Sequence, residues 1–370
     1  MTTAPGSADP RVSARWDETA EARAGNPLQG WLDCRLLFDE SFQARLSGAP
    51  NENWLEGLMR RAGVPKGGRW ASLGCGAAGE EKVAARRGLF ASLVGYDASP
   101  KSLEIARSSA EAEGLRQLTF EPIDLDDFTL PAGAFDVVLM NMALHHVREL
   151  RPALAAVHRA LAPGGVLILN EFVGPRQFQY PAAQVATVRA LLAALPESLR
   201  QDTANGIVKR EYVVWPIELW NQIDPSEAIR SDLILPELER CFEVAVRVDY
   251  GGTILNLLLE NIVHNFDPQD EKDAAILRLL AACEAALVDS GFLASDFTAI
   301  VARPLAEVRD VPPGGFAPPT RLGEVALAEP RGAGATAREI AALQAELAAM
   351  RASRVWRLAQ ALRGLLGRRW

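Results

Sequence analysis

A glycine-rich turn between a short apolar run and a helical stretch constrains the fold of this chain more than any other feature. The run 70–73 predicts a strand, Gly74, Cys75 and Gly76 follow it directly, and a helix is expected to begin near Gly79. Glycine lets the backbone approach a ligand closely, and the first N–H groups of a helix point toward a ligand bound there. The turn therefore predicts a bound nucleotide-like cofactor.

Two kinds of cofactor fit the turn taken alone. The spacing Gly74-x-Gly76-x-x-Gly79 matches the dinucleotide fingerprint, and Asp97 ends the next apolar run about where a ribose-binding acid belongs. This match by itself is weak, since many glycine-rich turns bind nothing. The segments after the turn decide between a nicotinamide dinucleotide and another nucleoside.

Apolar runs alternate with helical stretches from about residue 67 to residue 170. Short unbroken apolar runs of this kind are typical of buried parallel strands, and the alternation predicts helices on both faces of a sheet. A polar residue ends each of three runs, namely Asp97, Asp124 and Asn141, and Pro163-Gly164-Gly165 precedes the next run at 166–170. Because parallel strands end at one edge of a sheet, these polar side chains are expected to meet there.

This succession resembles the class I S-adenosylmethionine-dependent methyltransferases. The resemblance implies an α/β fold with a doubly wound, mostly parallel, seven-stranded Rossmann-like sheet whose last strand is antiparallel. It implies S-adenosyl-L-methionine as cofactor, with its methionine end at the glycine turn, its ribose at the acid after the second strand and its adenine at the acid after the third. The residues that it assigns to the cofactor are Gly74, Cys75, Gly76, Asp97, Ala98, Asp124, Leu125 and Asn141. Ser72 and Ala78 depart from the family pattern, which favours an acid and a third glycine there.

Composition excludes several other classes of protein. The net charge of −8 gives no overall reason to expect nucleic acid binding, and 49% hydrophobic residues suffice for a large core. The four cysteines lie far apart without metal-ligand spacing, so we expect neither a disulfide framework nor a metal site. The first residues lack an apolar core and no stretch reaches membrane-spanning length, which predicts a cytoplasmic enzyme.

The chain is expected to contain one catalytic domain and two flanking segments. Residues 1–25 are polar and predicted to be disordered, and 26–304 form the methyltransferase domain. Within it, residues of about 176–235 read as helical lid insertions, and apolar helices before the first strand either cover the mouth of the site or pack on the sheet. A Pro/Gly/Ala linker at 305–335 leads to a C-terminal helical tail at 336–370.

The tail helix has two readings. Its first part repeats apolar residues at spacings of three and four, as a short coiled coil would. Its second part mixes arginines with leucines and with Trp356 and Trp370, without one acidic residue after Arg351. A basic amphipathic helix predicts contact with an anionic membrane surface, whereas the coiled-coil-like part favours a protein partner or an oligomer.

Methyl transfer to oxygen or nitrogen needs an aligned nucleophile and a group that removes its proton. His145 and His146 follow the fourth strand, and the position of His146 resembles that of the catalytic histidine of some sugar methyltransferases. Glu171, directly after the fifth strand, is the alternative base, although it could instead anchor the lid. Either histidine could also cap a helix or support the cofactor.

The lid supplies three expected substrate residues, namely Tyr180, Glu227 and Arg230. For Glu227 and Arg230, the competing interpretation is a purely structural role at the start of a helix. Asp224 has the properties of an N-cap, Pro225 fits the first helical position and Glu227 the capping-box position, so the segment also predicts a helix start.

A narrower resemblance concerns short sequence segments outside the cofactor site. Segments 26–31, 170–175, 224–231 and 250–253 look like a bacterial subfamily associated with polysaccharide biosynthesis, and 353–358 is similar to the ends of surface-glycan enzymes. The resemblance implies O-methylation of a sugar hydroxyl in a surface glycan, with a possible peripheral position at the inner membrane face. The alternatives are methylation of a diffusible small molecule, such as a natural product, and a cofactor-binding scaffold without catalysis.

Overall fold

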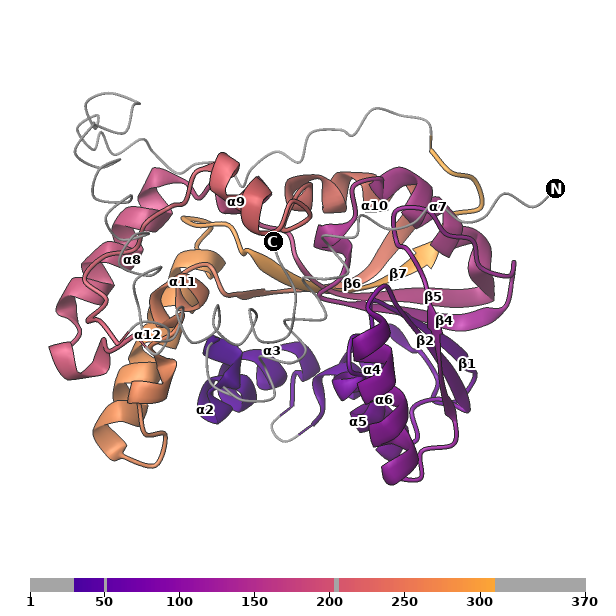
Figure 1. Ribbon diagram of the computed structural model, residues 1–370, viewed down its shortest axis with the longest axis horizontal. Helices are drawn as coiled ribbons and strands as arrows, with labels where there is room; N and C mark the ends of the chain where they lie inside the picture. Colours follow the sequence, from indigo (N-terminus) through magenta and orange to yellow (C-terminus); the bar gives the residue numbers. More distant parts are fainter. Residues whose placement is uncertain (1–29, 50–51, 203–205, 310–370) are drawn as a thin grey trace, which may run out of the picture.

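The computed structural model describes residues 30–49, 52–202 and 206–309, and within them one seven-stranded sheet runs through the molecule (Figure 1). Its order is β3-β2-β1-β4-β5-β7-β6, and only β7 runs antiparallel to its neighbours. The mostly parallel sheet and the antiparallel last strand are thus confirmed. The strands are β1 Arg69–Leu73, β2 Ser92–Asp97, β3 Leu118–Pro122, β4 Phe135–Asn141, β5 Leu161–Phe172, β6 Phe242–Gly251 and β7 Phe297–Pro304.

Helices cover both faces of the sheet because successive strand residues point to opposite sides. In β4, Val137 and Leu139 join the core on one face, whereas Val138 and Met140 join the core on the other. Figure 1 shows α4, α5 and α6 on the first face and α7 and α10 on the second. These helices are α4 Trp54–Ala62, α5 Gly79–Arg86, α6 Pro100–Ala112, α7 Leu150–Ala160 and α10 Ile234–Cys241.

The helices before the first strand pack on the β6 and β7 side of the sheet. Trp31 is 2% exposed, and its ring lies 6.3 Å from that of Tyr250 and 6.4 Å from that of Phe297. These helices were expected either to cover the mouth of the site or to pack on the sheet, and the contacts of Trp31 are those of packing on the sheet. The elements are η1 Trp31–Asp33, α2 Arg35–Leu37, η2 Phe38–Gln43 and α3 Ala44–Ser47.

The insertion after β5 is largely helical, as predicted. Its longest helix, α8, is tied to the core by Gln184, whose Nε2 donates to Asp296 Oδ2 at 2.7 Å and to the carbonyl of Thr253 at 2.8 Å. Its other elements are short and separated by loops. The insertion contains η4 Arg176–Phe178, α8 Ala182–Ala194, η5 Glu197–Leu199, α9 Ile217–Ile223 and η6 Ser231–Leu233.

The helical segment between β6 and α12 is broken in two. Asn261 has a φ of +59°, a left-handed conformation that ends a right-handed helix, and α11 stops at Leu259. A longer helix, α12, follows these two short helices. This part of the chain contains α11 Leu255–Leu259, η7 Val263–Asn265 and α12 Glu271–Asp289.

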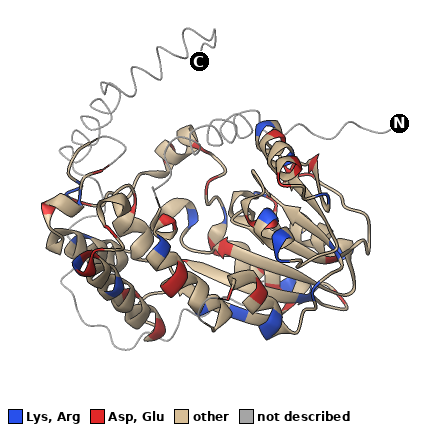
Figure 2. Ribbon diagram, turned by 90° about the horizontal axis from the view of Figure 1, so that it is seen from below, with Lys and Arg blue, Asp and Glu red and all other residues tan. Residues whose placement is uncertain are grey.

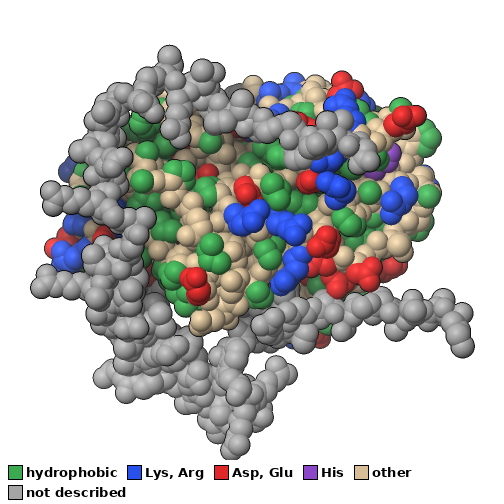
Figure 3. Space-filling view, turned by 90° about the horizontal axis from the view of Figure 1, so that it is seen from above, with side chains coloured by type: hydrophobic (Ala, Val, Ile, Leu, Met, Phe, Trp, Pro, Cys, Tyr) green, Lys and Arg blue, Asp and Glu red, His purple; other side chains and the backbone are tan. Residues whose placement is uncertain are grey.

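The surface mixes the two signs of charge. Acidic and basic residues are interspersed along the helices in Figure 2, and the face in Figure 3 sets basic and acidic side chains beside hydrophobic ones. On the α7–α10 side, the Arg151 guanidinium lies 3.2 Å from the Glu237 carboxylate.

All four cysteines lie in the described part and are free thiols. No described helix has the length and apolarity to cross a membrane. The predicted segments 1–25 and 336–370, and the linker after residue 309, lie outside the described residues.

Candidate active site

The glycine turn and Asp97 lie against each other at the carboxyl edge of the sheet. The N–H groups of Gly74 and Cys75 donate to the Tyr96 carbonyl at 2.8 and 3.0 Å. The N–H of Gly76 donates to Asp97 Oδ2 at 2.8 Å, and that of Ser99 donates to Oδ1 at 2.8 Å. The end of β2 is therefore fixed to the turn after β1, with a carboxylate between them, as a ribose site requires.

Only glycine fits at position 74. Its φ is +73°, and a Cβ placed there would lie 2.5 Å from the Cβ of Ala143. Ala78, by contrast, adopts a φ of +57° as the N-cap of α5 although it carries a side chain. Residue 78 thus keeps the left-handed backbone conformation, which glycine adopts more easily, although it is alanine where the family favours glycine.

Replacing Gly74 with alanine is expected to destabilise the protein by about 2–4 kcal/mol. About 1 kcal/mol comes from the left-handed backbone and the rest from the clash with Ala143. Urea unfolding measures this change. Gly164→Ala is the control, since Gly164 has a φ of +80° and nothing lies within 4 Å of the place that a Cβ would take there. Adding Ala143→Gly to Gly74→Ala removes the clash and should bring the loss down toward that of Gly164→Ala. Equal losses for Gly74→Ala and Gly164→Ala would show that the turn is not tightly packed.

The carboxyl ends of β3 and β4 lie at the same edge of the sheet as the glycine turn. Leu125 Cδ1 lies 3.6 Å from the position that a Cβ on Gly74 would take, so the segment after β3 borders the turn. Burial raises the pKa of Asp124, whose carboxylate accepts the N–H of Asp126 at 3.0 Å. Asn141 ends β4, and its Oδ1 accepts the Asn170 Nδ2–H at 2.8 Å. The predicted cofactor residues thus come from neighbouring strand ends.

Asn170 belongs to a short polar chain that the sequence did not indicate. Its Oδ1 accepts the hydroxyl of Tyr250 at 2.6 Å, so Tyr250 on β6 fixes the Asn170 amide that holds Asn141. The position of Asn170 at a strand end was visible in the sequence, but its pairing with a residue 80 positions away was not.

Glu171 holds His145 and the turn that bears both histidines. Its carboxylate is 0% exposed and accepts the N–H groups of Ala143 at 3.0 Å and Leu144 at 2.6 Å. It also contacts Nδ1 of His145. The carboxylate is therefore fully occupied within the protein. The expectation that Glu171 faces an acceptor as a base does not fit this burial, and its contacts are those of a positioning residue.

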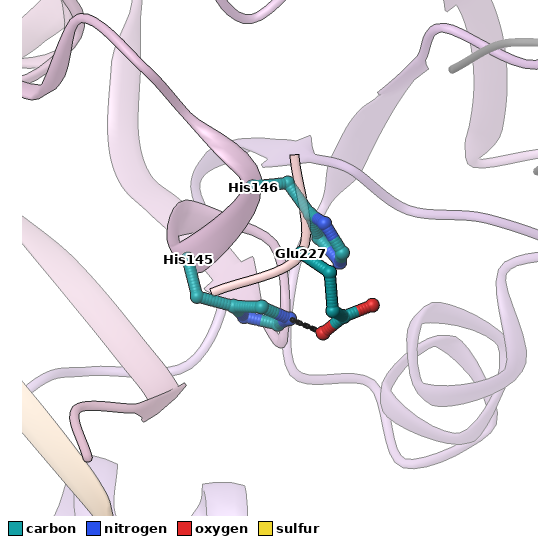
Figure 4. Close-up of side chains that lie close together, drawn as sticks. All are labelled: His145, His146 and Glu227. Carbon is teal, nitrogen blue, oxygen red and sulfur yellow. Dashed lines mark ion pairs between the residues drawn. The ribbon is translucent and has the colours of Figure 1, made fainter. Parts of the chain in front are cut away.

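The predicted helix start at Asp224 is wrong. Asp224 Oδ1 accepts the N–H of Ser226 at 2.9 Å and its hydroxyl at 2.6 Å, which closes a local turn. Ala228 then takes a φ of +48°, and α10 begins only at Ile234. Because residues 224–230 form turns, Glu227 points at the histidines, with Oε1 3.6 Å from His145 Nε2 (Figure 4).

The two histidines have opposite electrostatic surroundings. Burial alone would lower the pKa of His145, but the charge of Glu171 and the carboxylate of Glu227 outweigh it and raise the pKa. Burial, and then the charge of His145, lower the pKa of His146, against the attraction of Glu227. The ring centroids lie 4.0 Å apart, and Nδ1 of His146 lies 3.3 Å from the Ser226 hydroxyl oxygen. His146 is thus the neutral ring of the pair.

Aromatic side chains of the insertion form a cluster that packs on Phe172. Tyr180 is 8% exposed, and its ring lies 6.0 Å from that of Phe178 and 6.1 Å from that of Tyr212. Phe178 also packs at 5.1 Å on Phe172, which follows Glu171 in β5. Burial raises the pKa of Tyr180 well above its usual range, which keeps its hydroxyl neutral. Of the three expected substrate residues, Glu227 therefore contacts His145, and Tyr180 lies in the aromatic cluster of the insertion. Arg230 is exposed.

Comparison with known proteins identifies the part of the sheet from β1 to β5. Residues 71–169, from β1 to β5, match the protein family described as "Methyltransferase domain". The demethylmenaquinone methyltransferase of Tropheryma whipplei (strain Twist) is 30% identical over 198 residues, which cover 52% of this chain and 79% of that protein. The ubiquinone biosynthesis O-methyltransferase of Cereibacter sphaeroides is 33% identical over 28% of this chain and 41% of its own length.

Among solved structures, the geranyl diphosphate C-methyltransferase of Streptomyces coelicolor A3(2), in complex with Mg²⁺, geranyl diphosphate and S-adenosyl-L-homocysteine, is 14% identical, with a TM-score of 0.45 over 81% of this chain and 100% of that chain. At this level the similarity does not bear on substrate or mechanism. The sequence relatives do establish the family. The chain belongs to the class I S-adenosylmethionine-dependent methyltransferases.

Proposed function

We propose that this protein transfers the methyl group of S-adenosylmethionine to an acceptor hydroxyl at the carboxyl edge of the sheet. The observation that carries the proposal is the Asp97 carboxylate held at the glycine turn by the N–H of Gly76. Asp97 and Ala98 would bind the ribose, Gly74 to Gly76 the methionine end, and Asp124 and Leu125 the adenine. Asn141 would border the methionine end from β4.

The transfer is an in-line displacement at the methyl carbon. The acceptor oxygen forms its bond to that carbon while the carbon–sulfur bond breaks, and the electron pair stays on the sulfur of S-adenosylhomocysteine. This leaving group is a neutral thioether and needs no acid. What the protein must supply is alignment and a place for the hydroxyl proton.

His146 is the group that we propose to take this proton. The Ser226 hydroxyl has one hydrogen, which it donates to Asp224 at 2.6 Å, so its oxygen accepts from His146 Nδ1 at 3.3 Å. That contact assigns the ring hydrogen to Nδ1 and the basic lone pair to Nε2. His145 and Glu171 act as positioning residues that hold the turn bearing His146.

The acceptor that we propose is a sugar hydroxyl of a bacterial surface glycan. Two features support it. The sequence segments outside the cofactor site are similar to polysaccharide-associated enzymes, and the insertion that carries Glu227 also carries the aromatic cluster of Phe178, Tyr180 and Tyr212. Segment 336–370 would then bring the enzyme to the inner membrane face or to a glycan-assembly partner.

A diffusible small molecule is the second candidate acceptor. It is favoured by the names of two relatives, a demethylmenaquinone methyltransferase and a ubiquinone biosynthesis O-methyltransferase. An aromatic wall suits a planar apolar ring as well as a sugar.

The acceptor is tested with methyl-labelled S-adenosylmethionine and two fractions of a bacterial lysate, one of cell envelope and one of small molecules. We expect S-adenosylhomocysteine to form with the envelope fraction and mass spectrometry to find the label on a sugar. We also expect removal of residues 331–370 to lower transfer to the envelope. Label found only among small molecules would instead establish the second candidate, and turnover with neither fraction would contradict the proposed activity.

A further inference from the structure

We propose that His145, His146 and Glu227 form a binding site for one divalent transition-metal cation. One ligand atom of each residue lies within 4.8 Å of the others, and Figure 4 shows the three side chains converging. The catalytic role given to this cation below rests on the proposed function, but the binding itself does not.

The surroundings of His145 prepare its outer nitrogen for a metal. Nδ1 contacts the buried carboxylate of Glu171, which directs the ring hydrogen to that side and the lone pair of a neutral ring to Nε2. A carboxylate behind a histidine is the usual support of a metal-binding imidazole, since it fixes both the tautomer and the orientation of the ring. Nε2 then faces the carboxylate of Glu227 across 3.6 Å.

This 3.6 Å separation has a physical consequence. The positive charge that this contact needs can be a proton on Nε2 or a metal cation that replaces it, and the distance exceeds that of a good hydrogen bond. Zinc lies about 2.0–2.1 Å from imidazole nitrogen and about 2.0–2.2 Å from carboxylate oxygen, so two ligands of a tetrahedral site are about 3.4 Å apart. The gap between Nε2 and Oε1 therefore fits a shared cation.

His146 is prepared in the same way by a different support. Asp224 accepts the Ser226 hydroxyl hydrogen at 2.6 Å, and the Ser226 oxygen lies 3.3 Å from Nδ1 of His146. This arrangement again places the ring hydrogen on Nδ1 and the lone pair on Nε2. Both rings of the cluster thus have an outer support on Nδ1, although the two supports come from separate parts of the chain.

The ligand set indicates which metal binds. Two imidazoles and one carboxylate suit Zn²⁺, Co²⁺, Mn²⁺ or Fe²⁺, whereas Mg²⁺ and Ca²⁺ prefer sites made of oxygen. Three protein ligands leave one position open for an exogenous oxygen. We assign this position to the acceptor hydroxyl. The cation would stabilise the oxygen anion and so lower the pKa of the bound hydroxyl, which then loses its proton to water. His146 serves as a ligand in the metal-loaded enzyme and as proton acceptor without metal.

The spacing of the residues explains why the sequence predicted no metal site. His145 and His146 are adjacent, but Glu227 follows 81 residues after His146, on the turn that replaces the predicted helix start. No local pattern links these positions.

The binding is tested on full-length protein without an affinity tag, stripped with chelator, and without cofactor or acceptor. Calorimetry with Zn²⁺ is expected to give one cation per chain, and Co²⁺ is expected to give the visible absorption of a tetrahedral site. His145→Ala and Glu227→Gln should each weaken Zn²⁺ binding at least tenfold and remove the Co²⁺ spectrum. Ser226→Ala, which alters only a support, should weaken binding about 10-fold.

The matched control is His158→Gln. His158 lies on α7 with Nε2 2.7 Å from the Leu305 carbonyl, and its replacement should leave metal binding unchanged. Absence of binding to the stripped protein, or binding unaffected by both His145→Ala and Glu227→Gln, would overturn the site. The catalytic role is tested separately: one equivalent of metal should raise turnover at least tenfold. Equal turnover with and without metal would overturn that role and leave methyl transfer itself intact.

Discussion

Replacing Asp97 with alanine is expected to weaken the binding of S-adenosylmethionine by at least about 100-fold. In the proposed function the carboxylate accepts the two ribose hydroxyls, and a hydrogen bond to a charged group contributes about 1.5–3 kcal/mol. Two such bonds correspond to a loss of about 3 kcal/mol or more, and 1.4 kcal/mol is a factor of ten. The variant also loses the acceptor for the N–H of Gly76, which loosens the turn itself.

Calorimetric titration measures this loss, and Asp136→Ala is the matched control. Asp136 lies at the opposite edge of the same sheet, where its Oδ2 accepts the backbone N–H of Arg69 at 2.7 Å. The two variants therefore remove the same kind of carboxylate-to-backbone bond, but only one removes a group from the cofactor site. Wild-type affinity in Asp136→Ala is expected. A loss of less than threefold in Asp97→Ala would show that the ribose is bound elsewhere.

In metal-free enzyme, replacing His146 with alanine is expected to lower the rate of methyl transfer by about 100- to 10,000-fold, the usual contribution of a positioned acid or base. The affinity for S-adenosylmethionine should stay within about twofold, since the ring is assigned to the acceptor and not to the cofactor. Single-turnover transfer from labelled cofactor separates this chemical step from binding.

The control for this variant is again His158→Gln, which changes a histidine outside the cluster. It is expected to retain wild-type transfer. If His146→Ala kept more than a tenth of the wild-type rate, the proton would leave by another route and the assignment would fail. A parallel fall in cofactor affinity would instead show that His146 supports the cofactor.

The cofactor side of the site could be predicted because its information is local. Asp97 and Asn141 each end an apolar run, and the strand order of a parallel sheet brings such ends to one edge. The structure adds one detail that the pattern did not contain, namely that the Asp97 carboxylate binds the turn through Gly76. The roles of the other strand-end residues stay predictions.

The histidine side depended on contacts that no local pattern encodes. The sequence favoured a helix start at Asp224, because the capping residues fitted. In the fold, Asp224 binds Ser226 instead, and Ala228 adopts a left-handed backbone, so Glu227 meets His145. Similarly, the place of Glu171 after β5 was foreseen, but its direction was not. Its burial follows from the backbone N–H groups of Ala143 and Leu144, which need an acceptor where no water reaches.

A crystal structure of the protein with S-adenosylhomocysteine tests the central claim most directly. We predict that both ribose hydroxyls lie within about 3 Å of the Asp97 carboxylate oxygens, with the amino-acid end of the ligand at Gly74 to Gly76. The sulfur should face His146 across the acceptor space. A nucleoside bound away from Asp97, or a carboxylate that keeps only its backbone partners in the complex, would contradict the account.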